Sequence, residues 1–151
     1  MEDQGTTIKY KIGVYDKEDI DLTVLLQQFL EEKFNGEVGA LAIFIGKVKS
    51  FSREGVEVSH LEIETYREHA NKTLEKICSE VREKHGLVYA GIWHLIGRFK
   101  IGEPLVIVIA AGRSREEVFK ALPELVERYK KEPALFKKEV YIDGSYRWLE
   151  E

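Results

Sequence analysis

Two lysine pairs near the end of the chain could do chemistry on an anion. Lys130-Lys131 and Lys137-Lys138 stand on either side of an apolar segment in the stretch YKKEPALFKKE. Residues 128 to 138 hold five cations and one anion, Glu132, in a chain whose net charge is -4. Because a helix dipole also favours lysines at its C-terminus, composition leaves two interpretations open, a helix end and an anion site. Pro133 interrupts the path between the pairs, so they can converge only where the chain folds back.

Arg113 is a second candidate for binding an anion. It follows the apolar stretch PLVIVIAA and Gly112, and it precedes Ser114, where a helix is expected to begin. A helix N-terminus presents free N–H groups and the positive end of the dipole, and a nearby guanidinium would add affinity for a phosphate. A surface arginine on a loop is the alternative.

The single cysteine and the four histidines show no pattern of a metal or nucleophile site. Cys78 falls on the apolar face of an expected helix, which favours a core position over a reactive thiol. The histidines have no HExxH or other paired spacing, and His94, inside an apolar strand, is expected to be a satisfied structural residue. Gly46-Lys47 fails as a phosphate loop because Val48 stands where Ser or Thr is needed. We therefore expect no metal site.

The composition is that of one soluble domain. The chain has 151 residues, 44% hydrophobic and 33% charged, which suffices for one core, and we expect a single domain over 1–151. No apolar run approaches the roughly 20 residues that cross a bilayer, and the stretch MEDQGTTIKYK lacks the regions of a signal peptide. These features predict a cytoplasmic protein that binds no membrane, and the overall acidity argues against nucleic acid.

Hydrophobic periodicity predicts elements in the order βαββαββαβ. Expected strands cover 8–15, 38–48, 56–66, 87–96 and 104–111, with a last strand and an Asp-Gly turn in the tail, and helices cover 22–34, 70–85 and 114–129. Several neighbouring strands have no helix between them, which favours an α+β fold with antiparallel pairing. Ser114 and Glu117 have capping-box spacing, and Pro123 should kink or break the third helix. The polar loop 49–55 is expected to be mobile.

Four blocks of sequence follow one another in a distinctive order. They are GALAIFIGKVKS, LEIETYREHANKTLEKICSEV, HLIGRFKIGEPLVIVIAAGRSREEVF and YKKEPALFKKEVYIDGSYRWLE, and they extend from Gly39 to Glu150. Together they resemble the catalytic (large) subunit of molybdopterin synthase. The resemblance implies an α+β fold with a hammerhead-like part, largely antiparallel sheets with three main helices, and an enzyme without a cofactor.

The resemblance further implies a sulfurtransferase that works with a partner protein. In this family a small ubiquitin-like sulfur-carrier subunit inserts its C-terminal glycine thiocarboxylate into the large subunit. Two rounds of transfer then convert cyclic pyranopterin monophosphate into the dithiolene of molybdopterin. The large subunit would form a homodimer with one carrier on each side, a heterotetramer. A non-catalytic homologue that only docks the carrier is the main alternative, and a phosphate or nucleotide binder built on the lysines is another.

The resemblance also implies roles for particular residues. Lys130 would lie beside the carrier's terminal glycine, where an ammonium stabilises charge as sulfur leaves, and Lys137 would be a second essential lysine suited to proton transfer. Arg113 matches an arginine that binds the anionic substrate in a pocket formed partly by the other protomer. Arg147 matches a further arginine of that pocket.

Two positions of the expected pocket depart from the family pattern. Gly112 stands where the family often has histidine, and Lys49 stands where it often has arginine. The first change removes a possible donor or acid, and the second replaces a bidentate fork by a point charge. Both positions belong to the expected substrate-binding set. We therefore expect these two changes to affect the turnover rate and the affinity for the substrate.

Overall fold

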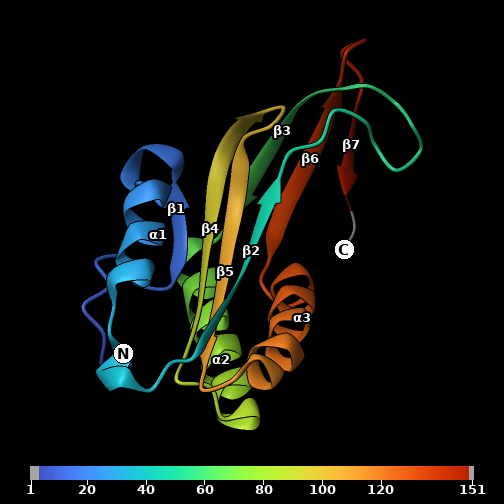
Figure 1. The fold of residues 1–151 in the computed structure, drawn as a ribbon. Helices are drawn as coiled ribbons and strands as arrows, with labels where there is room; N and C mark the ends of the chain where they lie inside the picture. Colours follow the sequence, from blue (N-terminus) through green and yellow to red (C-terminus); the bar gives the residue numbers. More distant parts are fainter. Residues whose placement is uncertain (1–3, 150–151) are drawn as a thin grey trace.

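The computed structural model describes residues 4–149 and has one sheet of seven strands covered by three α-helices (Figure 1). Six of these strands are expected from the sequence, and the seventh lies in the tail after the Asp-Gly turn. The strands are β1 (Gly13–Asp16), β2 (Ala40–Lys47), β3 (Val58–Thr65), β4 (Tyr89–Lys100), β5 (Pro104–Gly112), β6 (Leu135–Tyr141) and β7 (Tyr146–Leu149). The helices are α1 (Leu22–Glu31), α2 (Arg67–His85) and α3 (Arg115–Lys131). The predicted α+β class with largely antiparallel pairing is confirmed. Within 4–149, no helix is long and apolar enough to cross a membrane.

The sheet changes partners along β4. The strand order is β2-β5-β4-β3-β6-β7, and β1 pairs with β4 in parallel, while the other pairings of these strands are antiparallel. Residues 89–94 of β4 pair with β5, whereas residues 97–100 pair with β3. Gly97, at the change, has a φ of 116°, which L side chains rarely adopt. This glycine therefore lets β4 leave one partner and join the next, which brings β3 and β6 into the sheet.

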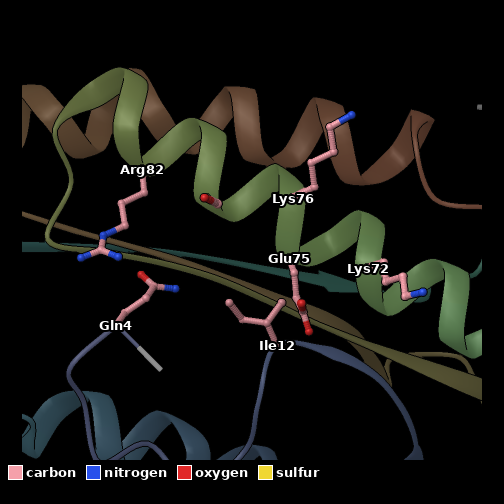
Figure 2. Close-up of a pocket in the computed structure, with 7 residues that line it drawn as sticks. Gln4, Ile12, Lys72, Glu75, Lys76 and Arg82 are labelled. Carbon is pink, nitrogen blue, oxygen red and sulfur yellow. The ribbon is translucent and has the colours of Figure 1, made fainter. Parts of the chain in front are cut away.

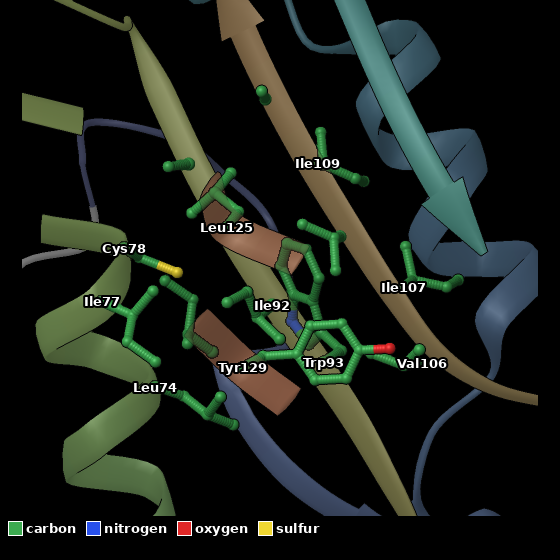
Figure 3. Packing of buried hydrophobic residues seen from close by; sticks show 14 of the residues in the cluster. Leu74, Ile77, Cys78, Ile92, Trp93, Val106, Ile107, Ile109, Leu125 and Tyr129 are labelled. Carbon is green, nitrogen blue, oxygen red and sulfur yellow. The ribbon is translucent and has the colours of Figure 1, made fainter. Parts of the chain in front are cut away.

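Different helices cover the two faces of the sheet. Successive residues of a strand point to opposite faces. On one face Phe29 of α1 packs against the rings of Tyr89 and Trp93, with centroids 5.1 and 5.4 Å away. On the other face α2 and α3 pack together, and Cys78 of α2 lies beside Ile92 (Figure 3). Cys78 is fully buried and burial raises the pKa of its thiol, so the predicted core position is confirmed.

The first strand is shorter than the predicted range 8–15. The N–H of Lys9 donates to the side chain of Gln28 (2.9 Å), and the C=O of Tyr10 accepts from the indole of Trp93 (3.0 Å). These backbone groups are bonded to side chains and are not available to a neighbouring strand. Regular pairing therefore begins only at Gly13.

Pro123 does not break α3, which excludes one of the two effects predicted for it, a kink or a break. The helix is continuous from Arg115 to Lys131 with Pro123 inside it. Pro123 and Phe119, one turn earlier, are both exposed. The carbonyl that loses its N–H partner therefore lies on the solvent side, where water can bond it.

Candidate active site

Lys130 lies at the end of α3, on a helix terminus that is held in place. Arg128 donates to Glu80 of α2 (Nη2 to Oε1, 2.7 Å) and to Glu132 (Nη2 to Oε1, 2.9 Å). The hydrogen bond from Arg128 lowers the pKa of Glu132. Tyr129, next to Lys130, is 1% exposed. The backbone at Lys130 is thus anchored on both sides, while its half-buried side chain stays partly accessible.

The chain folds back after α3, as convergence of the lysine pairs requires. The hydroxyl of Thr65 donates to the C=O of Ala134 (2.6 Å), which fixes the turn before β6 runs antiparallel to β3. Lys137 on β6 is only 6% exposed, and its Nζ lies 5.8 Å from the centroid of the Tyr129 ring. Lys137 therefore lies against the residue that precedes Lys130. The structure brings the two predicted catalytic lysines to the same end of α3.

The other lysine of each pair points elsewhere. Neighbouring residues of a strand face opposite sides, and Lys138 lies over the rings of Tyr146 and Trp148, at 4.2 and 5.9 Å. Lys131 is exposed and pairs with Glu127 at 3.3 Å. Each pair is thus split, and Lys130 and Lys137 are the members that can share a site.

A buried histidine belongs to the same cluster. His94 of β4 is fully buried, its ring centroid lies 5.6 Å from that of Tyr129, and its Nδ1 bonds the C=O of Leu95 at 2.8 Å. Its Nε2 has no hydrogen-bond partner within 4–149, so the prediction of a satisfied structural histidine is wrong at this atom. Burial, and then the charge of Lys137, lower the pKa of His94 to about 3. The imidazole is therefore neutral near pH 7.

The neutral state of His94 predicts a loss of stability in acid. The imidazole takes up a proton near pH 6.5 when unfolded but only near pH 3 when folded. As the pH falls through this window, the free energy of unfolding should decrease by about 1.4 kcal/mol per pH unit from this group. Chemical denaturation at several pH values measures the slope, and His94→Gln should remove this contribution. An equal slope in the variant would contradict a buried neutral imidazole.

Arg113 lies at the opposite end of α3 from the lysines. Its guanidinium donates to the C=O of Gly86 (3.2 Å) and pairs with Glu37 (3.3 Å). It lines a hollow of about 400 Å³ together with Arg82 of α2. At 1.5 Å per residue, the helix separates Arg113 from Lys130 by roughly 25 Å. One chain therefore does not bring Arg113 and the lysines into one pocket.

The start of α3 accounts for the glycine before Arg113. The carboxylate of Glu117 accepts the N–H of Arg113 (3.1 Å), and Ser114 makes no side-chain cap bond, so the expected capping box is not formed. A Cβ at Gly112 would lie 3.1 Å from both Glu117 Oε2 and Val118 Cγ1. A larger side chain would therefore press on Glu117 and disturb its bond to Arg113.

The two remaining predicted residues are associated with the loop between β2 and β3. Lys49 belongs to this loop, and Arg147 forms an ion pair with it. Arg147 of β7 is opposite Glu139 of β6, which puts it on the same face as Lys137, and it pairs with Glu54 of the loop at 3.0 Å. Lys49 is the second residue of this loop and is exposed. In one chain, the predicted residues thus fall at the two ends of α3 and at this loop.

The sequence and the fold of this chain are similar to those of known proteins. The family model described as MoaE protein matches residues 15–132. The chain belongs to the MoaE family. A molybdopterin synthase catalytic subunit from Pyrococcus abyssi is 34% identical over 116 residues, 77% of each chain, and one from Staphylococcus aureus strain Mu50 is 32% identical over 122 residues, 81% of each. The X-ray structure of molybdopterin synthase from Staphylococcus aureus aligns with a TM-score of 0.80 at 26% identity, covering 94% of this chain and 98% of that one.

Membership of the MoaE family confirms the resemblance seen in the sequence. The matched range ends at Glu132, so it includes the helix that carries Lys130 and stops before Lys137 and Arg147. The roles of the individual residues stay predictions. In the described part of this MoaE-family chain, no three His, Cys, Asp or Glu side chains are grouped so that they could hold a metal ion.

A separate hollow on the MoaE-family fold contains none of the predicted site residues. It measures about 360 Å³ and lies between α2 and the segment before β1 (Figure 2). Arg82 of α2 faces Gln4 across it, and Glu75 lies near Ile12. Arg82 also lines the hollow of Arg113, so the two recesses adjoin on the surface of α2.

Proposed function

We propose that this MoaE-family chain is the catalytic subunit of a molybdopterin synthase. It takes sulfur from the C-terminal thiocarboxylate of a small ubiquitin-like carrier and adds it to cyclic pyranopterin monophosphate in two rounds, which forms the dithiolene. The relatives from two organisms carry that name, and this chain spans 77% and 81% of their lengths. The observation that carries the proposal is the buried amino group of Lys137 beside the end of α3 that bears Lys130.

The surroundings of the two lysines suit different tasks. Lys130 is partly accessible at a helix end, so it can reach a thiocarboxylate on a protein tail and stabilise the charge that develops as sulfur leaves. Lys137 is shielded from solvent beside Tyr129, so its amino group can transfer a proton with little competition from water. Lys130 binds the tail in this proposal, and Lys137 acts as the acid or base. No cofactor takes part, and the reaction takes place in the cytoplasm.

A homodimer with one carrier on each side follows from the spacing of the site residues. Arg113 and Lys130 are roughly 25 Å apart in one chain, which exceeds the length of a pterin phosphate. Both can contact one substrate only if Arg113 comes from a second copy. Gly112, Lys49 and Arg147 are proposed to line the same pocket. Sedimentation with and without the carrier measures the assembly, and a monomer with full activity would contradict it.

Arg113→Ala should weaken binding of cyclic pyranopterin monophosphate. A hydrogen bond to a charged group contributes about 1.5–3 kcal/mol, so the dissociation constant should rise about tenfold to a hundredfold. Titration calorimetry without the carrier measures this constant in the absence of chemistry. Arg115→Ala is the comparison, because Arg115 is also exposed and lies in the first turn of α3.

The pair of variants gives three distinct outcomes. Weaker binding in Arg113→Ala alone supports the proposed role. Weaker binding in Arg115→Ala alone would move the role to Arg115, and equal small losses in both would indicate an effect of net charge.

Product formation separates the synthase from the non-catalytic docking protein. The chain is mixed with a thiocarboxylated carrier from the same source and cyclic pyranopterin monophosphate, and the dithiolene is detected by mass spectrometry. Product supports the synthase. A stable complex with the carrier that yields no product would favour the docking protein, and it would point to Gly112 as the position to examine.

A further inference from the structure

His94 has a polar atom that packing alone does not explain. The side chain is fully buried, its Nδ1 bonds the C=O of Leu95 at 2.8 Å, and Nε2 is left without a partner in the described part of the chain. With Nδ1 as the donor to a carbonyl, Nε2 carries the lone pair and is an acceptor. An unbonded buried acceptor is costly, and an apolar side chain would fill the same space without that cost.

The surroundings of His94 indicate which donor its Nε2 could serve. Tyr129 contacts the imidazole, with 5.6 Å between centroids, and the Nζ of Lys137 lies 5.8 Å from the centroid of the same Tyr129 ring. The strand neighbours of His94 are apolar, since it is opposite Val106 on β5 and Val14 on β1. The charge of Lys137 also acts on the imidazole and lowers its pKa. Lys137 is thus a charged donor close to this buried acceptor.

We propose that His94 is a positioning residue for Lys137 in the sulfur-transfer reaction. Its neutral imidazole supports the ring of Tyr129 and offers Nε2 as an acceptor to the amino group of Lys137 when the carrier tail occupies the site. The inference rests on the proposed function, because it assigns a role within that reaction. His94 is enclosed in the core, so it acts through Lys137 and not on the substrate.

This role requires an imidazole without charge. A protonated imidazole would donate from both nitrogens and would repel the ammonium of Lys137. Burial beside Lys137 keeps the pKa of His94 far below 7, at about 3, so Nε2 remains an acceptor wherever the fold is intact.

Two substitutions of His94 separate positioning from packing. Gln and Met have similar length and no charge, but only Gln carries an oxygen that can accept from Lys137. Losing a hydrogen bond to a charged group corresponds to about a tenfold effect or more, so His94→Met should lower kcat for dithiolene formation by that factor. The KM for cyclic pyranopterin monophosphate should not change. His94→Gln should recover most of the lost rate, and thermal unfolding of both variants checks the fold.

A purely structural His94 predicts the opposite order, because Met suits an apolar site better than Gln. Equal rates in the two variants, or a faster Met variant, would overturn the proposal. If either variant does not fold, the wild-type protein still gives a readout in the nitrogen-15 chemical shift of Nε2. That shift should move toward a hydrogen-bonded value when a carrier with an ordinary glycine carboxylate is added, and an unchanged shift would overturn the proposal. Absence of product from the wild type would contradict the proposed function itself. This outcome differs from a change in the order of the two variants, which would contradict only the role of His94.

Discussion

Lys130→Ala should slow dithiolene formation by about a hundredfold or more while the chain stays folded. Removing one group that stabilises charge in a transition state typically lowers the rate by about 10²–10³. The helix end depends on Arg128 and Tyr129 and not on the Lys130 side chain, so we expect little change in the melting temperature. A single-turnover assay with saturating carrier and pterin measures the rate.

Lys131→Ala is the matched control for this variant. Lys131 occupies the next position of the same helix, is exposed and forms a surface ion pair with Glu127 at 3.3 Å. Such a pair is worth about 0.3–0.5 kcal/mol, so the control should remain folded and active. Equal losses in the two variants would mean that only the total charge at the helix end matters, and Lys130 would have no particular role.

Lys137→Met should produce the second large loss of activity. Methionine keeps the buried aliphatic stem and removes the amino group beside Tyr129, so packing is largely preserved. A positioned acid or base contributes about 10²–10⁴ to the rate, and we expect product formation to fall by about a hundredfold or more. Carrier binding, measured by calorimetry, should be unchanged because Lys137 is only 6% exposed.

Lys138→Met provides the comparison on the opposite face of β6. Lys138 lies over the rings of Tyr146 and Trp148 and away from Lys137. It should keep its activity if the chemistry takes place on the Lys137 side. Loss of activity in Lys138→Met with a normal rate in Lys137→Met would place the chemistry on the Lys138 face of β6. That result would contradict the role proposed for Lys137.

The fold class could be predicted because its signals are local. The apolar stretch 104–111 predicts β5 from its composition alone. The apolar residues at helical spacing in 70–85 likewise predict α2. The last four residues of β4, 97–100, fall outside the predicted strand because GRFK contains two charged residues and a glycine. Its pairing with β3 depends on Gly97 taking a positive φ, which no local pattern of hydrophobicity reveals.

The sequence indicates the candidate site residues, but it reveals little of how they are arranged in space. The sequence showed that the lysine pairs could meet only through a fold-back, and the turn at Ala134 and the pairing of β6 with β3 provide it. The contacts of Arg113 with Glu37 and Gly86 join distant segments, so spacing could not predict them. A single histidine in an apolar strand was a visible signal for His94, but its unbonded Nε2 appears only in three dimensions.

The synthase assignment is tested by the mass of the pterin that forms from cyclic pyranopterin monophosphate and a thiocarboxylated carrier from the same source. With the wild-type chain, we predict a product that has gained two sulfur atoms as the dithiolene of molybdopterin. With Lys130→Ala, this product should form about a hundredfold more slowly. A wild-type chain that binds the carrier and leaves the pterin without sulfur would contradict the assignment of this protein as a synthase.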